Sequence, residues 1–190
     1  AVISDAQIGL ALVSASFFPA TSNPEDVEAA RRKVFYAGDE SFWATTFWLD
    51  PMLRGSLPQD WLEHNAYALA GLDLDDLKII HQPLDFLGVN IYNSRMVRAG
   101  ENGPEEVNFA PGCPRTLFQW PVTPESLYWH PKFLWERYGL PIVITENGLS
   151  NQDWISMDGK VHDPQRIDFT RRYLIQLRRA AREGVGMLGY

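Results

Sequence analysis

The stretch from Glu136 to Ser150, which reads E-R-Y-G-L-P-I-V-I-T-E-N-G-L-S, constrains the fold more than any other part of the chain. Its centre, residues 142–145, is apolar and β-branched without alternation, which predicts a parallel strand buried on both faces under covering helices. Gly139 supplies the left-handed residue that ends a preceding helix, and Asn147-Gly148 favours a turn. A carboxylate, Glu146, therefore stands at the carboxyl end of a buried strand, where α/β barrels place their chemistry.

Further segments repeat this alternation of strands and helices. Residues 8–13 and 86–91 are apolar and predict buried strands, with Gly88 allowing a neighbour to approach closely. Residues 164–183 predict a helix, and residue 186 begins what reads as another strand. The apolar face expected on that helix comprises Ile167, Thr170, Leu174, Leu177 and Ala181. The order favours an α/β fold in which residues 1–190 form a single domain, half of a (β/α)8 TIM barrel.

Two polar side chains lie together at the end of the second of these strands. Asn90 and Tyr92 are two residues apart, so they share one face of the strand at its carboxyl end. Residues 98–115 contain several Gly and Pro residues and predict a long loop with little regular structure. Long loops on the active face of a barrel commonly shape the substrate pocket.

The segment Y-G-L-P-I-V-I-T-E-N-G resembles the nucleophile segment of the glycoside hydrolase family 1 β-glucosidases. The resemblance implies that Glu146 is the catalytic nucleophile. D-F-L-G-V-N-I-Y resembles a second family segment, which implies that Tyr92 donates a hydrogen bond to that carboxylate and that Asn90 binds substrate. Trp120 corresponds to a family tryptophan that lines the aglycone side of the pocket, although Gln119 stands where the family usually has Gly.

Three more tryptophans, Trp43, Trp48 and Trp61, are candidates for aglycone contacts, but core packing is the preferred interpretation of each. The chain as a whole is rich in aromatic residues, at 13% with seven Trp. Aromatic faces pack against the C–H faces of sugar rings, so this excess fits a carbohydrate enzyme. It fits an aromatic core equally well, and composition does not separate the two.

By the same resemblance, the chain spans the family's strand five to the start of strand eight. The acid/base Glu of the family lies in an Asn-Glu-Pro motif at the end of strand four, and this sequence contains no such motif. We therefore expect a retaining β-glycosidase fragment with the nucleophile but without its partner, inactive as an isolated chain. Its expected partners are a β-glucoside or oligosaccharide substrate and a complementary N-terminal half-barrel, or self-association in its place.

Two alternatives stay open at this point. One is a non-catalytic carbohydrate-binding or assembly half-barrel, and the other is an unrelated barrel hydrolase in which Glu146 is a general base. The net charge of −7 argues against nucleic-acid binding. A single cysteine, Cys113, leaves no metal cluster to propose, and no cofactor is expected. The sequence has no apolar run of membrane-spanning length, and we expect a cytoplasmic location.

Overall fold

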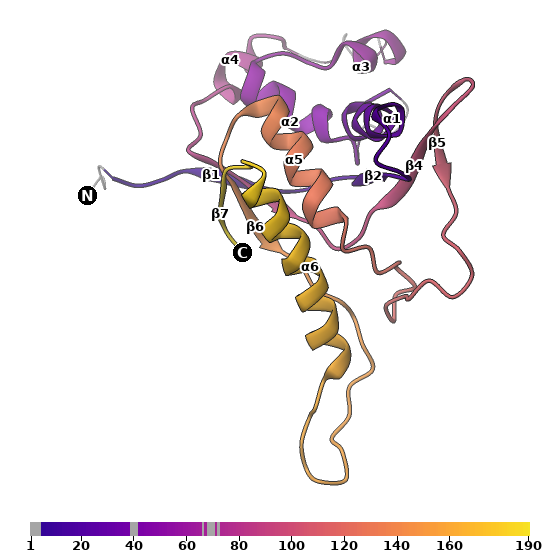
Figure 1. Ribbon diagram of the computed structural model, residues 1–190. Helices are drawn as coiled ribbons and strands as arrows, with labels where there is room; N and C mark the ends of the chain where they lie inside the picture. The colour runs from indigo at the N-terminus through magenta and orange to yellow at the C-terminus, as the bar shows by residue number, and fades with distance from the viewer. Residues whose placement is uncertain (1–4, 39–41, 66, 68–70, 72) are drawn as a thin grey trace.

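The computed structural model describes residues 5–38, 42–65, 67, 71 and 73–190 (Figure 1). None of the helices in this described part is long and apolar enough to cross a membrane. The elements in chain order are β1 (Gly9–Val13), β2 (Phe17–Pro19), α1 (Pro24–Phe35), α2 (Thr45–Arg54), α3 (Gln59–His64), α4 (Asp76–Ile80), β3 (Phe86–Asn90), β4 (Arg95–Gly100), β5 (Gly103–Val107), α5 (Ser126–Tyr138), β6 (Ile142–Glu146), α6 (Pro164–Arg182) and β7 (Met187–Gly189).

The main sheet has four strands in the order β1-β3-β6-β7, and every neighbouring pair is parallel. The strand order follows the chain order, and helices lie between successive strands. This is the arrangement of consecutive strands in an α/β barrel. Within the described residues the sheet stays open and does not close into a barrel. Gly139 ends α5 in the left-handed conformation at φ 68°, which confirms that part of the prediction.

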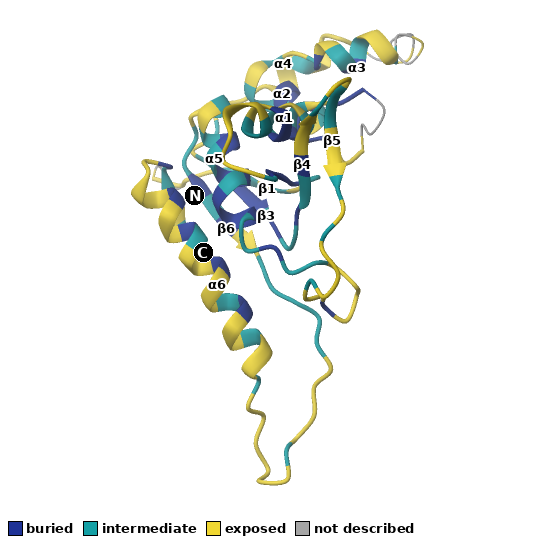
Figure 2. Ribbon diagram, turned by 45° about the vertical axis from the view of Figure 1, so that its right-hand side comes forward, coloured by how far each residue is buried: buried dark blue, intermediate teal, exposed yellow. Residues whose placement is uncertain are grey.

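Helices α5 and α6 cover one face of the main sheet, and the core lies between them and the strands (Figure 2). Ile142 and Ile144 of β6 point into this core and are 0% and 3% exposed. Val143 is half-buried and Thr145 is exposed, so the prediction of a strand buried on both faces is wrong. The described chain covers only one side of β6. A Cβ atom on Gly88 would lie 2.6 Å from the Leu10 carbonyl oxygen, so the expected close approach is confirmed.

A second sheet of three strands, β2-β4-β5, was not anticipated from the sequence. The strand expected at residues 8–13 is present as β1, but its residues are half-buried or exposed, so the prediction of a buried strand is wrong there. β2, which follows it, belongs to the other sheet. The loop predicted for residues 98–115 is wrong over its first half. There, β4 and β5 form an antiparallel hairpin in which Gly100 pairs with Gly103. These glycines flank a two-residue turn, so they mark a tight hairpin and not an irregular loop.

Helix α6 buries a different face from the one its sequence suggested. Its buried residues are Phe169, Tyr173, Leu177 and Ala180, of which only Leu177 belongs to the expected face. Ile167 and Leu174 are instead 64% and 38% exposed. The aromatic residues Phe169 and Tyr173 set which face of α6 is buried. Tyr173 is fully buried, and its hydroxyl forms two hydrogen bonds. Its hydroxyl donates to the Tyr92 carbonyl oxygen at 2.9 Å and accepts from the Thr123 backbone N–H at 2.9 Å.

A buried ionic cluster joins α2 to the last turn of α5. The Asp50 residue is 4% exposed, and its carboxylate accepts a hydrogen bond of 2.5 Å from Arg137 Nη2. The Tyr138 hydroxyl donates to the same carboxylate at 2.8 Å. Burial and the neighbouring Asp50 charge raise the pKa of Tyr138, so the phenol stays protonated and remains a donor. The cluster fixes the end of α5, four residues before β6 begins.

We predict that Asp50→Ala lowers the free energy of unfolding by about 3–5 kcal/mol, because it leaves Arg137 without its buried counter-charge. Urea denaturation measures this loss. The matched control is Asp168→Ala, which breaks an ion pair with Arg172 whose side chains are both more than half exposed. That change should cost about 0–1 kcal/mol. Equal losses in the two variants would contradict a structural role for the buried cluster.

Candidate active site

The end of β6 presents Glu146 at the carboxyl edge of the main sheet, where the side chain is exposed. The Tyr92 hydroxyl donates a hydrogen bond to Glu146 Oε2. The backbone around this pair is also joined, because the Ile91 N–H donates to the Glu146 carbonyl oxygen at 2.9 Å. Asn147 Nδ2 then donates to the Ile91 carbonyl oxygen at 2.7 Å. The two strand ends therefore hold the phenol and the carboxylate in one fixed relation.

A register shift places Asn90 beside this pair. Between Val89 and Asn90 the pairing of β3 with β6 slips, so that Asn90 pairs with Glu146. The Thr145 hydroxyl donates to Asn90 Oδ1 at 2.6 Å and orients the carboxamide. All of these polar groups lie at the carboxyl end of neighbouring parallel strands, the edge at which open α/β sheets bind their ligands.

A cavity of about 320 Å³ opens next to the carboxylate, and Asn90, Tyr92 and Trp120 are among the residues that line it. The indole of Trp120 lies with its centroid 5.6 Å from the Tyr92 ring. Glu146 does not itself line this cavity, but it is bonded to Tyr92, which does. The structure thus brings together the four residues that the sequence singled out.

The same cavity contains residues whose place the sequence did not indicate. Trp43 is 51% exposed and lines it, whereas packing was the preferred interpretation of this residue. Trp61 is buried, at 6% exposed, and does pack in a core cluster. Ser14 also lines the cavity. A lone serine after an apolar strand carries no sequence signal, and the exposure of Trp43 depends on contacts that are distant in sequence.

A buried histidine lies behind Ser14. His130 Nε2 is 3.4 Å from Ser14 Oγ, and the Thr45 hydroxyl donates to the same Ser14 oxygen at 3.0 Å. His130 is 2% exposed, and its Nδ1 atom is buried without a hydrogen-bond partner among the described residues. Burial lowers the pKa of His130 from 6.5 to about 4. The ring is therefore neutral near pH 7, and it supports the cavity wall without adding charge.

The turn that carries Trp120 is strained. Gln119 has φ 64°, in the left-handed region that favours glycine. Arg115 Nη1 donates to the Gln119 carbonyl oxygen at 2.8 Å, and the Thr116 N–H donates to the Trp120 carbonyl oxygen at 2.9 Å. These bonds hold the turn in its conformation although the residue is unsuited to it. This is also the position at which the resembling family usually has Gly.

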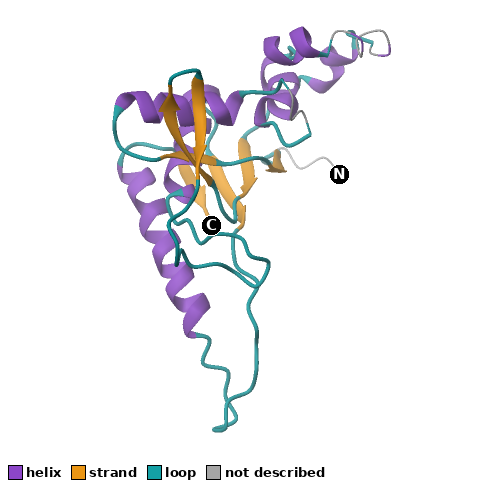
Figure 3. Ribbon diagram, turned by 90° about the vertical axis from the view of Figure 1, so that its right-hand side faces the viewer, coloured by secondary structure: helices purple, strands orange, loops and turns teal. Residues whose placement is uncertain are grey.

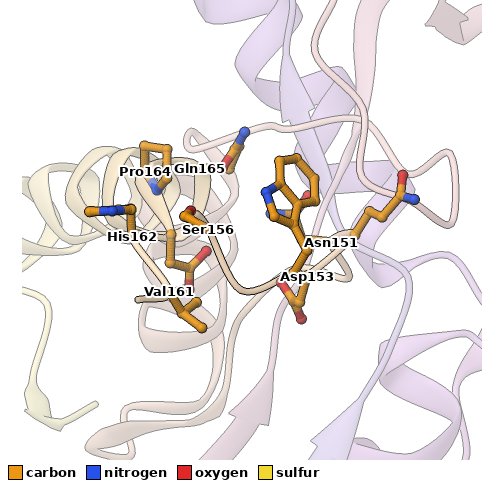
Figure 4. A pocket seen from close by; sticks show the side chains of 10 residues that line it. Asn151, Asp153, Ser156, Val161, His162, Pro164 and Gln165 are labelled. Carbon is orange, nitrogen blue, oxygen red and sulfur yellow. The ribbon is translucent and has the colours of Figure 1, made fainter. Parts of the chain in front are cut away.

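The loop after Glu146 encloses a second, smaller cavity of about 180 Å³ lined by residues 151–154, 156 and 161–165 (Figure 4). Arg166 closes this loop by pairing with Asp153 at 2.7 Å and with Asp163 at 2.8 Å. The hydrogen bond from Arg166 lowers the pKa of Asp153. Asp153 therefore stays ionised at neutral pH, which suits a loop anchor and not a general acid.

We predict that Gln119→Gly raises the free energy of unfolding by about 0.5–1 kcal/mol. Glycine adopts the left-handed conformation without the cost of roughly 1–2 kcal/mol that other residues bear, and its larger chain entropy in the unfolded state removes part of the gain. Urea denaturation measures the change. Gln152→Gly, in an exposed loop at negative φ, should give no gain. A stabilisation equal in both variants would show that backbone strain is not its source.

We predict that the unfolding free energy decreases as the pH falls from about 6.5 to about 4, in part because of His130. In this window the unfolded chain binds a proton on His130 while the folded chain does not, so protonation favours unfolding. The effect of this one group approaches about 3 kcal/mol at the acid end and grows no further below pH 4. Urea denaturation across the window should show a steeper loss in the unaltered chain than in His130→Leu. Parallel curves would contradict the assignment.

The sequence profile described as Glycosyl hydrolase family 1 matches residues 1–190. A 1,4-beta-D-glucan glucohydrolase of Thermotoga neapolitana is 36% identical over 99% of this chain and 43% of its own length. Beta-glucosidase A of Acetivibrio thermocellus is 36% identical over 98% of this chain and 42% of its length. The chain therefore spans less than half the length of these relatives.

Solved structures agree with the sequence matches. The family 1 β-glucosidase of Thermotoga maritima in complex with isofagomine lactam superimposes with a TM-score of 0.77 at 33% identity. The match covers 98% of this chain and 41% of the β-glucosidase. A profile match over the full sequence, relatives above 30% identity and a shared fold over nearly all residues lead to one conclusion. The chain belongs to glycosyl hydrolase family 1.

Proposed function

We propose that this chain supplies the nucleophile part of a retaining β-glucosidase site, with Glu146 as the nucleophile. The observation that carries the proposal is the hydrogen bond from the Tyr92 hydroxyl to the Glu146 carboxylate beside an aromatic-walled cavity. A phenol that donates to a carboxylate fixes the orientation of the carboxylate and the direction of its free lone pairs. An ionised, oriented carboxylate is what attack on an anomeric carbon requires.

The reaction proceeds in two steps. A Glu146 carboxylate oxygen forms a bond to the anomeric carbon while the bond from that carbon to the aglycone oxygen breaks, and an acid protonates the departing oxygen. Water then attacks the anomeric carbon of the glycosyl-enzyme, a base takes its proton, and Glu146 is released. Tyr92 orients Glu146 in both steps. Trp120 and Trp43, on the cavity walls, pack against the leaving aglycone or the sugar ring.

In this proposal the acid/base carboxyl does not come from residues 1–190. A retaining enzyme needs a second carboxyl about 5–5.5 Å from the first, with a raised pKa. The sequence has no Asn-Glu-Pro motif. Asp153 is paired with Arg166, and Glu136 is paired with Arg31 at 2.6 Å, so neither meets the requirement. A complementary N-terminal half-barrel would supply the acid and the groups that hold the sugar.

We predict that the chain reacts covalently with a dinitrophenyl 2-deoxy-2-fluoro-β-glucoside and that the label resides on Glu146. The activated leaving group departs without a proton, so the missing acid does not prevent this step, and the fluorine slows hydrolysis of the product. A high reagent concentration offsets the absence of the groups that hold the sugar. Mass spectrometry of the intact chain and of its peptides locates the label. Turnover of an unactivated β-glucoside should be at least about 10²-fold below that of a full-length relative, which is the usual contribution of a general acid.

The controls separate this mechanism from its rivals. Glu146→Gln should abolish labelling, whereas Glu136→Gln removes a carboxylate on α5 and should leave it unchanged. Sugar binding without labelling would favour a non-catalytic carbohydrate-binding fragment. Glycoside turnover without a covalent adduct would favour a hydrolase that uses Glu146 as a general base. Turnover of an unactivated β-glucoside at the level of a full-length relative would overturn the claim that the acid is absent.

A further inference from the structure

We propose that Ser150 is a positioning residue that sets the indole of Trp120 relative to Glu146 and thereby tunes the reaction toward substrates with an aromatic aglycone. The inference rests on the proposed function of Glu146 and adds to it a residue outside the cavity. Ser150 lies four residues after Glu146, in the loop that follows β6.

Ser150 joins two loops that are far apart in the sequence. Its side-chain Oγ accepts a hydrogen bond of 3.1 Å from the Phe118 backbone N–H. Its carbonyl oxygen accepts another of 3.1 Å from the Leu117 N–H. One residue of the nucleophile loop therefore accepts two consecutive backbone donors from the turn that carries Trp120. The two bonds together restrain both the position and the tilt of that turn.

The restraint reaches the indole through a short, rigid path. Within the turn, the Gln119 N–H donates to the Thr116 carbonyl oxygen at 2.9 Å, and Phe118 packs edge-on against Trp120 at 5.5 Å between centroids. Gln119 is in a strained conformation, so contacts from outside the turn add to the internal bonds that keep it in place. Ser150 supplies such a contact to the two residues that immediately precede Gln119.

The other end of the loop is fixed as well. Asn147 Nδ2 donates to the Ile91 carbonyl oxygen, and Asn147 Oδ1 accepts from the Tyr190 hydroxyl at 3.1 Å. The nucleophile loop is thus anchored next to Glu146 and bonded to the Trp120 turn at Ser150. A shift of this loop moves the Trp120 side of the cavity. Loss of the Ser150 hydroxyl loosens the Trp120 turn while the Glu146 carboxylate stays in place.

The consequence depends on the leaving group. A planar aromatic aglycone gains from stacking on a correctly placed indole, whereas a fluoride leaving group makes no such contact. Ser150→Ala removes the acceptor for the Phe118 N–H and keeps the carbonyl acceptor for the Leu117 N–H. We expect the rate of Glu146 labelling by a dinitrophenyl 2-deoxy-2-fluoro-β-glucoside to fall by about three- to tenfold, the effect of one lost hydrogen bond. Labelling by 2-deoxy-2-fluoro-β-glucosyl fluoride should change by less than about twofold.

The test compares four forms of the full chain with both reagents: the unaltered sequence, Ser150→Ala, Ser150→Thr and Ser156→Ala. Ser150→Thr keeps the hydroxyl and should restore the preference for the aromatic reagent. Ser156 lies in the same loop and lines the smaller cavity (Figure 4). Ser156→Ala should therefore behave as the unaltered chain. Amide hydrogen exchange at Phe118 and the Trp120 indole N–H resonance are recorded for each form. Both should change in Ser150→Ala only.

Three results would count against the proposal. Equal slowing of both reagents in Ser150→Ala would mean that the residue supports the fold or Glu146 generally. Unchanged labelling by both reagents would mean that the bond to Phe118 does not place the indole. An unchanged Phe118 exchange rate and Trp120 resonance would overturn it without any labelling. If neither reagent labels the unaltered chain, the proposed function of Glu146 fails, and the exchange and resonance data still decide the positioning of Trp120.

Discussion

The site depends on the contact between the Tyr92 phenol and the Glu146 carboxylate, because this contact makes an exposed side chain at a sheet edge hold one position. A free glutamate at the end of a strand samples several rotamers. The slip in register between β3 and β6 brings Asn90 opposite Glu146, and Ile91 bonds the Glu146 backbone. The Tyr92 phenol, two residues after Asn90, then reaches the Glu146 carboxylate. The irregularity in the ladder is what aligns the two groups.

The one-sided burial of the main sheet explains why this edge is accessible. Helices α5 and α6 pack on the face that holds Leu87, Val89 and Ile144, and these residues are almost completely buried. In Figure 3 the longest helix, α6, runs along one side of the strands. The opposite face carries residues such as Ala11, Val13 and Thr145, which are exposed. In a closed barrel this inner face meets the inner faces of the other strands. An open sheet with a bare inner face favours association with a complementary segment.

Much of this architecture could be predicted from local patterns. The β-branched run before Glu146 forms a strand, Gly139 ends the preceding helix, and Tyr92 lies beside Glu146, all from local patterns. The strand is nevertheless buried on one face only. The pairing of β2 with β4 could not be predicted, because it joins Phe17 to Arg95 across a long stretch of sequence. The β4-β5 hairpin is local, but its Gly and Pro residues suggested an irregular loop. The buried face of α6 depends on Tyr173 reaching the Tyr92 carbonyl oxygen, a contact that helical periodicity does not contain. Trp43 joined the cavity for the same reason.

The position of Glu146 follows from packing at the other end of its strand. The Asp50 carboxylate holds Tyr138, the last residue of α5, and the chain then turns at Gly139 and enters β6. A strand of five residues between two parallel neighbours transmits this placement to its carboxyl end with little freedom. The ionic cluster and the Glu146 carboxylate therefore lie at the two ends of one rigid element. A protein that needs a carboxylate fixed to within a fraction of an ångström gains by burying the start of the strand and exposing only its end.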